Sequence, residues 1–151
     1  MQIHQNNFYK VFKGCHNRVI EHLKRSGIHI SDIDIYTNNR ALIICKLDII
    51  LTEHRNSVDK NRFVLFGKNA LYHYLFTKKG IPLSEAKSMS FHDSLIVLWG
   101  DIAACELPRN VDDFLHEHYD LISHESHDID TPFRYFEESE WDPSFADEIF
   151  R

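Results

Sequence analysis

The densest group of side chains suited to metal binding or acid–base chemistry lies between residues 116 and 128. It contains four histidines and four carboxylates: His116, Glu117, His118, Asp120, His124, Glu125, His127 and Asp128. Zinc and other transition metals take such ligands. However, His116 and His118 would point about 200° apart on a helix, and the order of residues matches no metal-binding motif. We therefore expect no metal and no cofactor, and a metal-dependent enzyme using this cluster is kept as an alternative.

Nucleophilic catalysis has less support. The run from Ser90 to Asp93 holds Ser, His and Asp, but adjacency in sequence is not triad geometry, and a helix N-cap at Ser90 explains the same residues. The sequence contains no Gly-x-Ser-x-Gly turn, no phosphate-binding loop and no dinucleotide fingerprint. We expect a protein that is not an enzyme.

The cysteines indicate the compartment. Cys15, Cys45 and Cys105 are odd in number, widely spaced and set among apolar neighbours, which is typical of buried thiols in a reducing environment. Residues 1–7 are polar, and the longest apolar stretches, 41–45 and 95–99, are far too short to span a membrane. These features predict a cytoplasmic protein with no membrane partner.

Charge divides the chain sharply at residue 110. Residues 1–109 contain 15 Lys and Arg against 10 Asp and Glu, whereas residues 110–151 contain 2 against 13, which gives the net charge of −6. The acidic part is also rich in aromatic residues: Phe133, Tyr135, Phe136, Trp141, Phe145 and Phe150. Aromatic side chains are poor choices for a tail that only solvates. The segment is therefore expected to bind either a basic protein or the chain's own basic face.

Direct binding of nucleic acid is not expected. Residues 83–99 resemble a helix-turn-helix in outline, but the second helix offers mainly apolar residues where base recognition needs Arg, Lys, Asn or Gln. The acidic segment would also repel phosphates.

Helical spacing of apolar residues covers most of the chain. Helices are predicted over 8–25, 61–79, 83–87 and 90–105, followed by one that begins at Asn110 and runs to residue 122. The 90–105 helix is apolar on most sides and is expected to be the central core element. A further helix is expected to start at Thr131-Pro132.

The segment between the first two predicted helices is ambiguous. Residues 28–35 alternate like a strand, and Thr37 to Arg40 are turn formers. Residues 41–54 fit a helix better than a strand, although a β-hairpin near 28–47 stays open. The predicted fold is a mainly α, single-domain bundle of about six helices over 1–151, or an α+β fold if the hairpin forms. Its C-terminal part, 110–151, is an acidic, aromatic-rich helical segment.

A small, acidic, helical chain with such a surface resembles, as a class, the immunity proteins that protect bacteria from contact-delivered or colicin-like nuclease toxins. The resemblance rests on residues 110–151 and on the helical build. It implies a non-catalytic inhibitor whose carboxylates occupy the basic cleft of a toxin as phosphate mimics, with Tyr135, Phe136 and Trp141 as anchors. The expected contact residues are Asp112, Asp113, Glu117, Asp120, Tyr135, Phe136, Glu137, Glu138, Glu140, Trp141 and Asp142.

The main alternative to an inhibitor is a phage or mobile-element helical adaptor or assembly chaperone, for which the helices around residues 82–99 are equally suitable. If the acidic segment instead folds onto the chain's own basic face, it is not the functional site.

Overall fold

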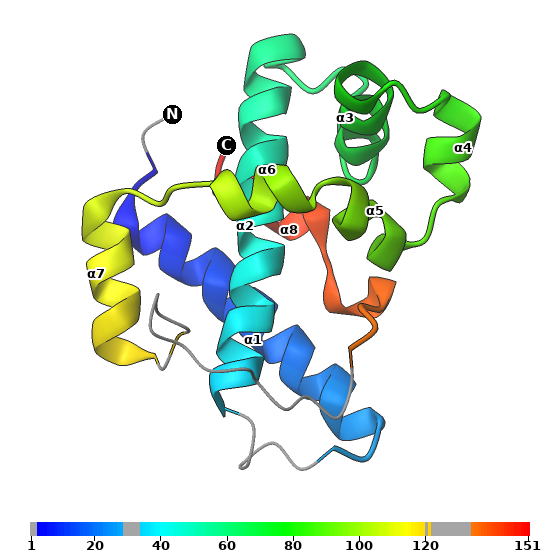
Figure 1. The fold of residues 1–151 in the computed structure, drawn as a ribbon. Coiled ribbons are helices and arrows are strands. Elements are labelled where there is room, and N and C mark those ends of the chain that lie inside the picture. Colours follow the sequence, from blue (N-terminus) through cyan, green and yellow to red (C-terminus); the bar gives the residue numbers. More distant parts are fainter. Residues whose placement is uncertain (1–2, 29–33, 120, 122–133) are drawn as a thin grey trace.

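The computed structural model describes residues 3–28, 34–119, 121 and 134–151 of the chain. These residues form eight α-helices and one short 3-10 helix, with no strand among them (Figure 1). The elements are α1 (Gln5–Arg25), α2 (Asp34–Val58), α3 (Asn69–Lys79), α4 (Leu83–Ser88), α5 (Phe91–Val97), α6 (Trp99–Ala104), α7 (Arg109–His118), η2 (Glu138–Glu140) and α8 (Pro143–Ile149). The predicted mainly α fold is confirmed.

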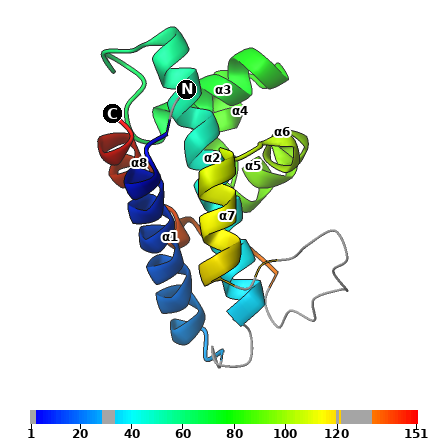
Figure 2. The same cartoon turned by 90° about the vertical axis from the view of Figure 1, so that its left-hand side faces the viewer.

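The first helix follows the predicted apolar stripe. Its buried side chains recur every three or four residues: Phe8, Val11, Phe12, Cys15, Val19 and Leu23. The helix begins three residues earlier than predicted, because the His4 side chain accepts a hydrogen bond from the Asn6 backbone N–H at 3.2 Å and caps it. α1 packs against α2, and α7 packs against α1 (Figure 2).

α2 is the central helix of the bundle. The preference for a helix over 41–54 is confirmed, but the predicted turn at Thr37 to Arg40 is wrong, because these residues lie within α2. The possible β-hairpin near 28–47 is contradicted over residues 34–47, which are helical. Residues 29–33 lie outside the described part of the chain. Asn38 is a turn former that is buried here and bonded to another helix: its Oδ1 lies 2.8 Å from His16 Nε2.

The predicted helix over 61–79 is wrong in its first half. Residues 59–68 form a loop, and α3 begins only at Asn69. The carboxylate of Asp59 accepts three backbone N–H groups of this loop, and Gly67 adopts a left-handed φ of 57°. Such local bonds compete with helix formation. Phe63 and Phe66, which helical spacing assigned to a buried face, are 80% and 57% exposed.

The segment from Leu83 to Cys105 is divided more finely than predicted. α4 forms as expected, and Ser90 Oγ accepts the Asp93 N–H at 3.1 Å as the predicted cap. The expected long helix is interrupted at the fully buried Leu98, so that α5 and α6 face different neighbours. Ile96 and Trp99 are 63% and 52% exposed, so this segment is not the central core element.

Within its described residues, the acidic part contains α7, η2 and α8, whereas residues 134–137 and 141–142 are not helical. α7 starts at Arg109 after Pro108, without the side-chain cap expected from Asn110. α8 is capped by Asp142, whose Oδ1 accepts the Phe145 N–H at 3.2 Å. The helix start expected at Thr131-Pro132 lies outside the described residues. In the described part of the chain no helix combines the length and apolar character that crossing a membrane requires.

Gly14 of α1 lies against the Phe145 ring of α8. A Cβ atom at this position would lie 2.9 Å from Phe145 Cε1, whereas a Cβ at Gly100 in α6 would meet nothing within 4 Å. We predict that Gly14→Ala lowers the free energy of unfolding by about 1–2 kcal/mol, because the added methyl group would collide with Phe145. This loss should exceed the gain from the higher helix propensity of alanine. Gly100→Ala should raise it by about 0.5–1 kcal/mol. Urea denaturation of both variants measures these changes, and the same sign for both would contradict the packing described.

Candidate functional site

The predicted contact residues fall into groups with different surroundings. Asp112, Asp113 and Glu117 are exposed on α7, and Asp120 lies outside the described residues. The other predicted contact residues belong to a C-terminal segment, residues 134–151, which packs against α1 and α2 (Figure 1). The two parts of the acidic region therefore differ in their surroundings.

Glu140 forms the main charged contact of the C-terminal segment. Its Oε2 accepts from Arg40 Nε and its Oε1 from Arg40 Nη2, both at 2.6 Å, and both side chains are 0% exposed. A two-pronged guanidinium–carboxylate pair is among the strongest hydrogen-bonded contacts in proteins. Glu140 Oε1 also accepts the Glu137 backbone N–H at 3.0 Å, and the Phe136 ring lies 3.9 Å from the Arg40 guanidinium carbon. All the oxygens of this carboxylate are therefore used inside the chain.

Trp141 is equally internal. Its indole N–H donates to Asp48 Oδ1 at 2.8 Å, and its ring stacks on Phe91 with centroids 5.0 Å apart. The prediction that Glu140 and Trp141 are exposed partner contacts is therefore wrong: they are 0% and 6% exposed. Tyr135, 42% exposed and stacked on His92, and the exposed Glu137, Glu138 and Asp142 remain accessible.

Two more acidic residues of the segment pair with the basic part of the chain. Asp147 Oδ1 lies 2.7 Å from Arg62 Nε and 3.8 Å from Arg55 Nε, and Glu138 pairs with Lys68. Within residues 134–151, Glu138, Glu140 and Asp147 thus bind the chain's own basic residues, whereas Glu137 and Asp142 are exposed. Glu140 and Asp147 therefore have a structural role.

Asp48 is the most perturbed carboxyl in this interface. Burial raises its pKa from 3.8 to about 7, although the Trp141 hydrogen bond and the nearby charges of Arg18 and Arg55 oppose the shift. Cys15 Sγ lies 3.8 Å from its Oδ2. A carboxyl with this pKa changes charge near neutral pH while completely enclosed, so we expect the docking of the C-terminal segment to depend on pH.

Sequence reasoning missed Arg40, Asp48, Arg55, Arg62 and Asp147. A signal for two of them was present, because Asp48 and Arg55 interrupt the apolar stripe of a helix. A charged side chain on the buried side of a helix requires a partner from elsewhere. What the sequence could not supply was the partner, which lies up to one hundred residues away.

Within the described residues, Asp112 and Asp113 of α7 have ion-pair partners on the same helix. Asp112 lies 3.4 Å from His116 Nε2 and Asp113 lies 4.0 Å from Arg109 Nε, both one turn apart on the same helix. α7 uses its other face to pack on α1, where Phe114 contacts Tyr9 edge-to-face at 5.4 Å. This helix therefore presents an acidic face to solvent, and we call Asp112, Asp113 and Glu117 the α7 acidic face.

The titratable groups of the described residues give no support to the alternative of a metal-dependent enzyme. His54 lines a pocket of 490 Å³ with Tyr74, Asp101 and Cys105. Burial lowers its pKa to about 4, and burial raises the pKa of the Cys105 thiol. A neutral imidazole held against His73 and a protonated thiol are poor proton-transfer groups at neutral pH. Most of the 116–128 cluster lies outside the described residues. Among the residues that the structure describes, no three His, Cys, Asp or Glu side chains are grouped so that they could hold a metal ion.

A scan against protein-family models gives no match for this chain, and comparisons with curated proteins and with solved structures likewise give none. The functional proposal therefore depends on the surfaces of the chain itself.

Removing the charge of Glu140 should be far more damaging than removing that of Glu138. Glu140→Gln leaves the Arg40 guanidinium buried without its counter-ion, which is expected to lower the free energy of unfolding by about 3–5 kcal/mol. Glu138→Gln breaks an exposed pair with Lys68 and should cost less than about 1 kcal/mol. Urea denaturation followed by circular dichroism compares the two, and equal losses would contradict an internal role for the Arg40–Glu140 pair.

Asp48→Asn should change stability in a pH-dependent way. Between pH 4 and 7 the folded wild type keeps a proton on Asp48 that the unfolded chain releases, so the wild type loses stability as the pH rises through this range. Asparagine has no such charge and can still accept the Trp141 N–H. The variant should therefore gain on the wild type between pH 4 and pH 8, by up to about 4 kcal/mol. Denaturation at both pH values measures this gain, and a pH-independent difference would exclude a raised pKa.

Proposed function

We propose that this chain is a non-catalytic inhibitor that binds a basic protein, a nuclease-type toxin, through the α7 acidic face. The observation that carries the proposal is the contrast between the two acidic parts. Residues 134–151 use Glu140 and Asp147 on internal arginines. Asp112, Asp113 and Glu117 instead face solvent, and within the described residues Asp112 and Asp113 have ion-pair partners on the same helix.

The negative charge of the α7 acidic face is suited to the recognition of a basic protein. A nuclease presents a basic cleft to its substrate, and carboxylates on a rigid helix resemble the phosphates that fill it. α7 is held by aromatic contacts to α1: Tyr9 with Phe114, and Phe12 with Tyr119 at 4.9 Å. A charged face on a fixed helix loses little conformational freedom on binding. Glu137, Glu138 and Asp142 are exposed as well, but they belong to the C-terminal segment and not to the α7 acidic face.

Affinity capture and kinetics test the proposal. The immobilised wild-type chain should retain a basic nuclease from extract of its native cell, and the purified nuclease should lose activity at a one-to-one ratio. Asp112→Lys/Asp113→Lys/Glu117→Lys should slow association at least tenfold at low salt, with a smaller effect as salt rises.

The matched control reverses three exposed carboxylates elsewhere, Glu21→Lys/Glu53→Lys/Glu148→Lys, which changes the net charge by the same amount. This control should associate faster than the α7 variant. Capture of no nuclease, or equal rates for the two variants, would contradict the proposal.

A further inference from the structure

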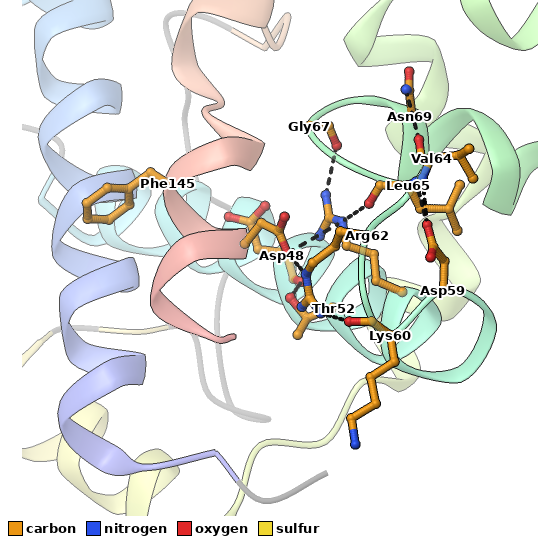
Figure 3. Close-up of polar contacts among 12 residues, drawn as sticks. Asp48, Thr52, Asp59, Lys60, Arg62, Val64, Leu65, Gly67, Asn69 and Phe145 are labelled. Atoms are coloured by element: carbon orange, nitrogen blue, oxygen red, sulfur yellow. Dashed lines mark hydrogen bonds and ion pairs between the residues drawn. The ribbon is translucent and has the colours of Figure 1, made fainter.

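The loop between α2 and α3 is unusually well fixed for a loop. The Asp59 carboxylate accepts the backbone N–H groups of Phe63, Val64 and Leu65 at 3.0, 2.8 and 2.9 Å. Asn69 Nδ2 donates to the Val64 carbonyl at 3.0 Å. Figure 3 shows that Asp59 at one end of the loop and Asn69 at the other are both bonded to the backbone of Val64 in its middle. The loop backbone is thus held in one conformation.

Two buried arginines, Arg55 and Arg62, also hold the loop in place. Arg55 donates from Nε to the Leu65 carbonyl at 3.0 Å and from Nη2 to the Gly67 carbonyl at 2.8 Å. Arg62, with a left-handed φ of 55°, pairs with Asp147 of α8 at 2.7 Å. A left-handed backbone at a residue other than glycine is strained. It is maintained here by the ion pair, so the loop shape depends on the docked C-terminal segment.

This fixed loop presents apolar side chains to solvent. Phe63, Val64 and Phe66 are 80%, 63% and 57% exposed, and Val58 at the end of α2 is 53% exposed. Contiguous exposed apolar side chains are a mark of interaction surfaces. A loop ordered in advance also binds with a smaller entropic cost. We call Phe63, Val64 and Phe66 the apolar loop patch.

A pocket of 230 Å³ adjoins the apolar loop patch. Val64 and Leu65 form one side of it, and Tyr72 and Leu83 of α3 and α4 form another. Its charged lining residue is Lys87, and its lining contains no carboxylate. Lys60 lies in the loop itself, and among the described residues neither Lys60 nor Lys87 has an ion-pair partner. The charged residue that lines the pocket is therefore a cation, and Lys60 adds a second cation in the adjoining loop.

We propose that the apolar loop patch and its pocket bind an acidic segment of a protein partner that carries a bulky apolar residue. The apolar side chain enters the pocket beside Val64, and neighbouring carboxylates pair with Lys60 and Lys87. The pocket favours a peptide over a flat lipid surface, because it accommodates a single side chain. An anionic membrane would also approach Glu138, which is 60% exposed and pairs with Lys68 next to the loop.

This second surface goes beyond the proposed inhibitor function and does not depend on it. α7 packs on α1, whereas the loop follows the C-terminal end of α2 (Figure 1). The partner chemistry is also opposite, since the α7 acidic face is complementary to a basic protein and the loop patch to an acidic one.

Selection of random twelve-residue peptides against the wild-type chain tests the proposal. The selected peptides should share a bulky apolar residue flanked by Asp or Glu. Phe63→Ser/Phe66→Ser and, separately, Lys60→Glu/Lys87→Glu should each weaken the best peptide at least tenfold. Because all four side chains lie on the surface, the melting temperatures of these variants should stay close to that of the wild type.

Matched controls use equally exposed side chains elsewhere. Ile96→Ser/Trp99→Ser and Lys10→Glu/Lys24→Glu should leave peptide binding unchanged, and so should the triple reversal on α7. The last control separates failure of this proposal from failure of the inhibitor function.

Four outcomes would overturn the proposal. These are peptides without acidic residues, peptide binding that survives the loop substitutions, a dimer in sedimentation that Phe63→Ser/Phe66→Ser abolishes, and binding to phosphatidylserine vesicles that the same substitutions abolish.

Discussion

The buried pair between Arg40 and Glu140 is the constraint on which the rest of the structure depends. Two fully enclosed charges, one hundred residues apart in sequence, satisfy each other at 2.6 Å. Either side chain alone would be an uncompensated charge in the core. The pair therefore obliges the C-terminal segment to lie across α2, which brings Trp141 to Asp48 and Asp147 to Arg62. Through Arg62 and Arg55 the same docking fixes the loop that follows α2.

Local patterns in the sequence were reliable where local forces decide the structure. The stripe from Phe8 to Leu23, the cap at Ser90 and the helical preference of 41–54 were read correctly because spacing and capping act within a few residues. Asn38 was misread as a turn former because a histidine on another helix satisfies its side chain. Phe63 was misread as buried because the bonds of Asp59 override helical periodicity.

The division of charge along the chain has two physical meanings. In residues 134–151, Glu140 and Asp147 neutralise buried arginines of the basic part, so these two side chains serve stability and are removed from recognition. Sequence composition could identify the acidic quarter but not this division, because the internal partners come from α2 and the loop after it. The two proposed binding sites lie elsewhere: on the α7 acidic face and, at the end of α2, on exposed apolar side chains beside Lys60 and Lys87.

The most direct test of the account is hydrogen exchange at the two tryptophan indoles. Trp141 is 6% exposed and donates to Asp48, whereas Trp99 is 52% exposed and serves as an internal reference. If the C-terminal segment is an integral part of the core, the Trp141 indole N–H should exchange only through global unfolding, at a rate that follows the overall free energy of unfolding. Trp99 should exchange at nearly the rate of a free indole. Equal, fast exchange at both indoles in two-dimensional NMR spectra would show that the segment is a detached tail and would contradict the account.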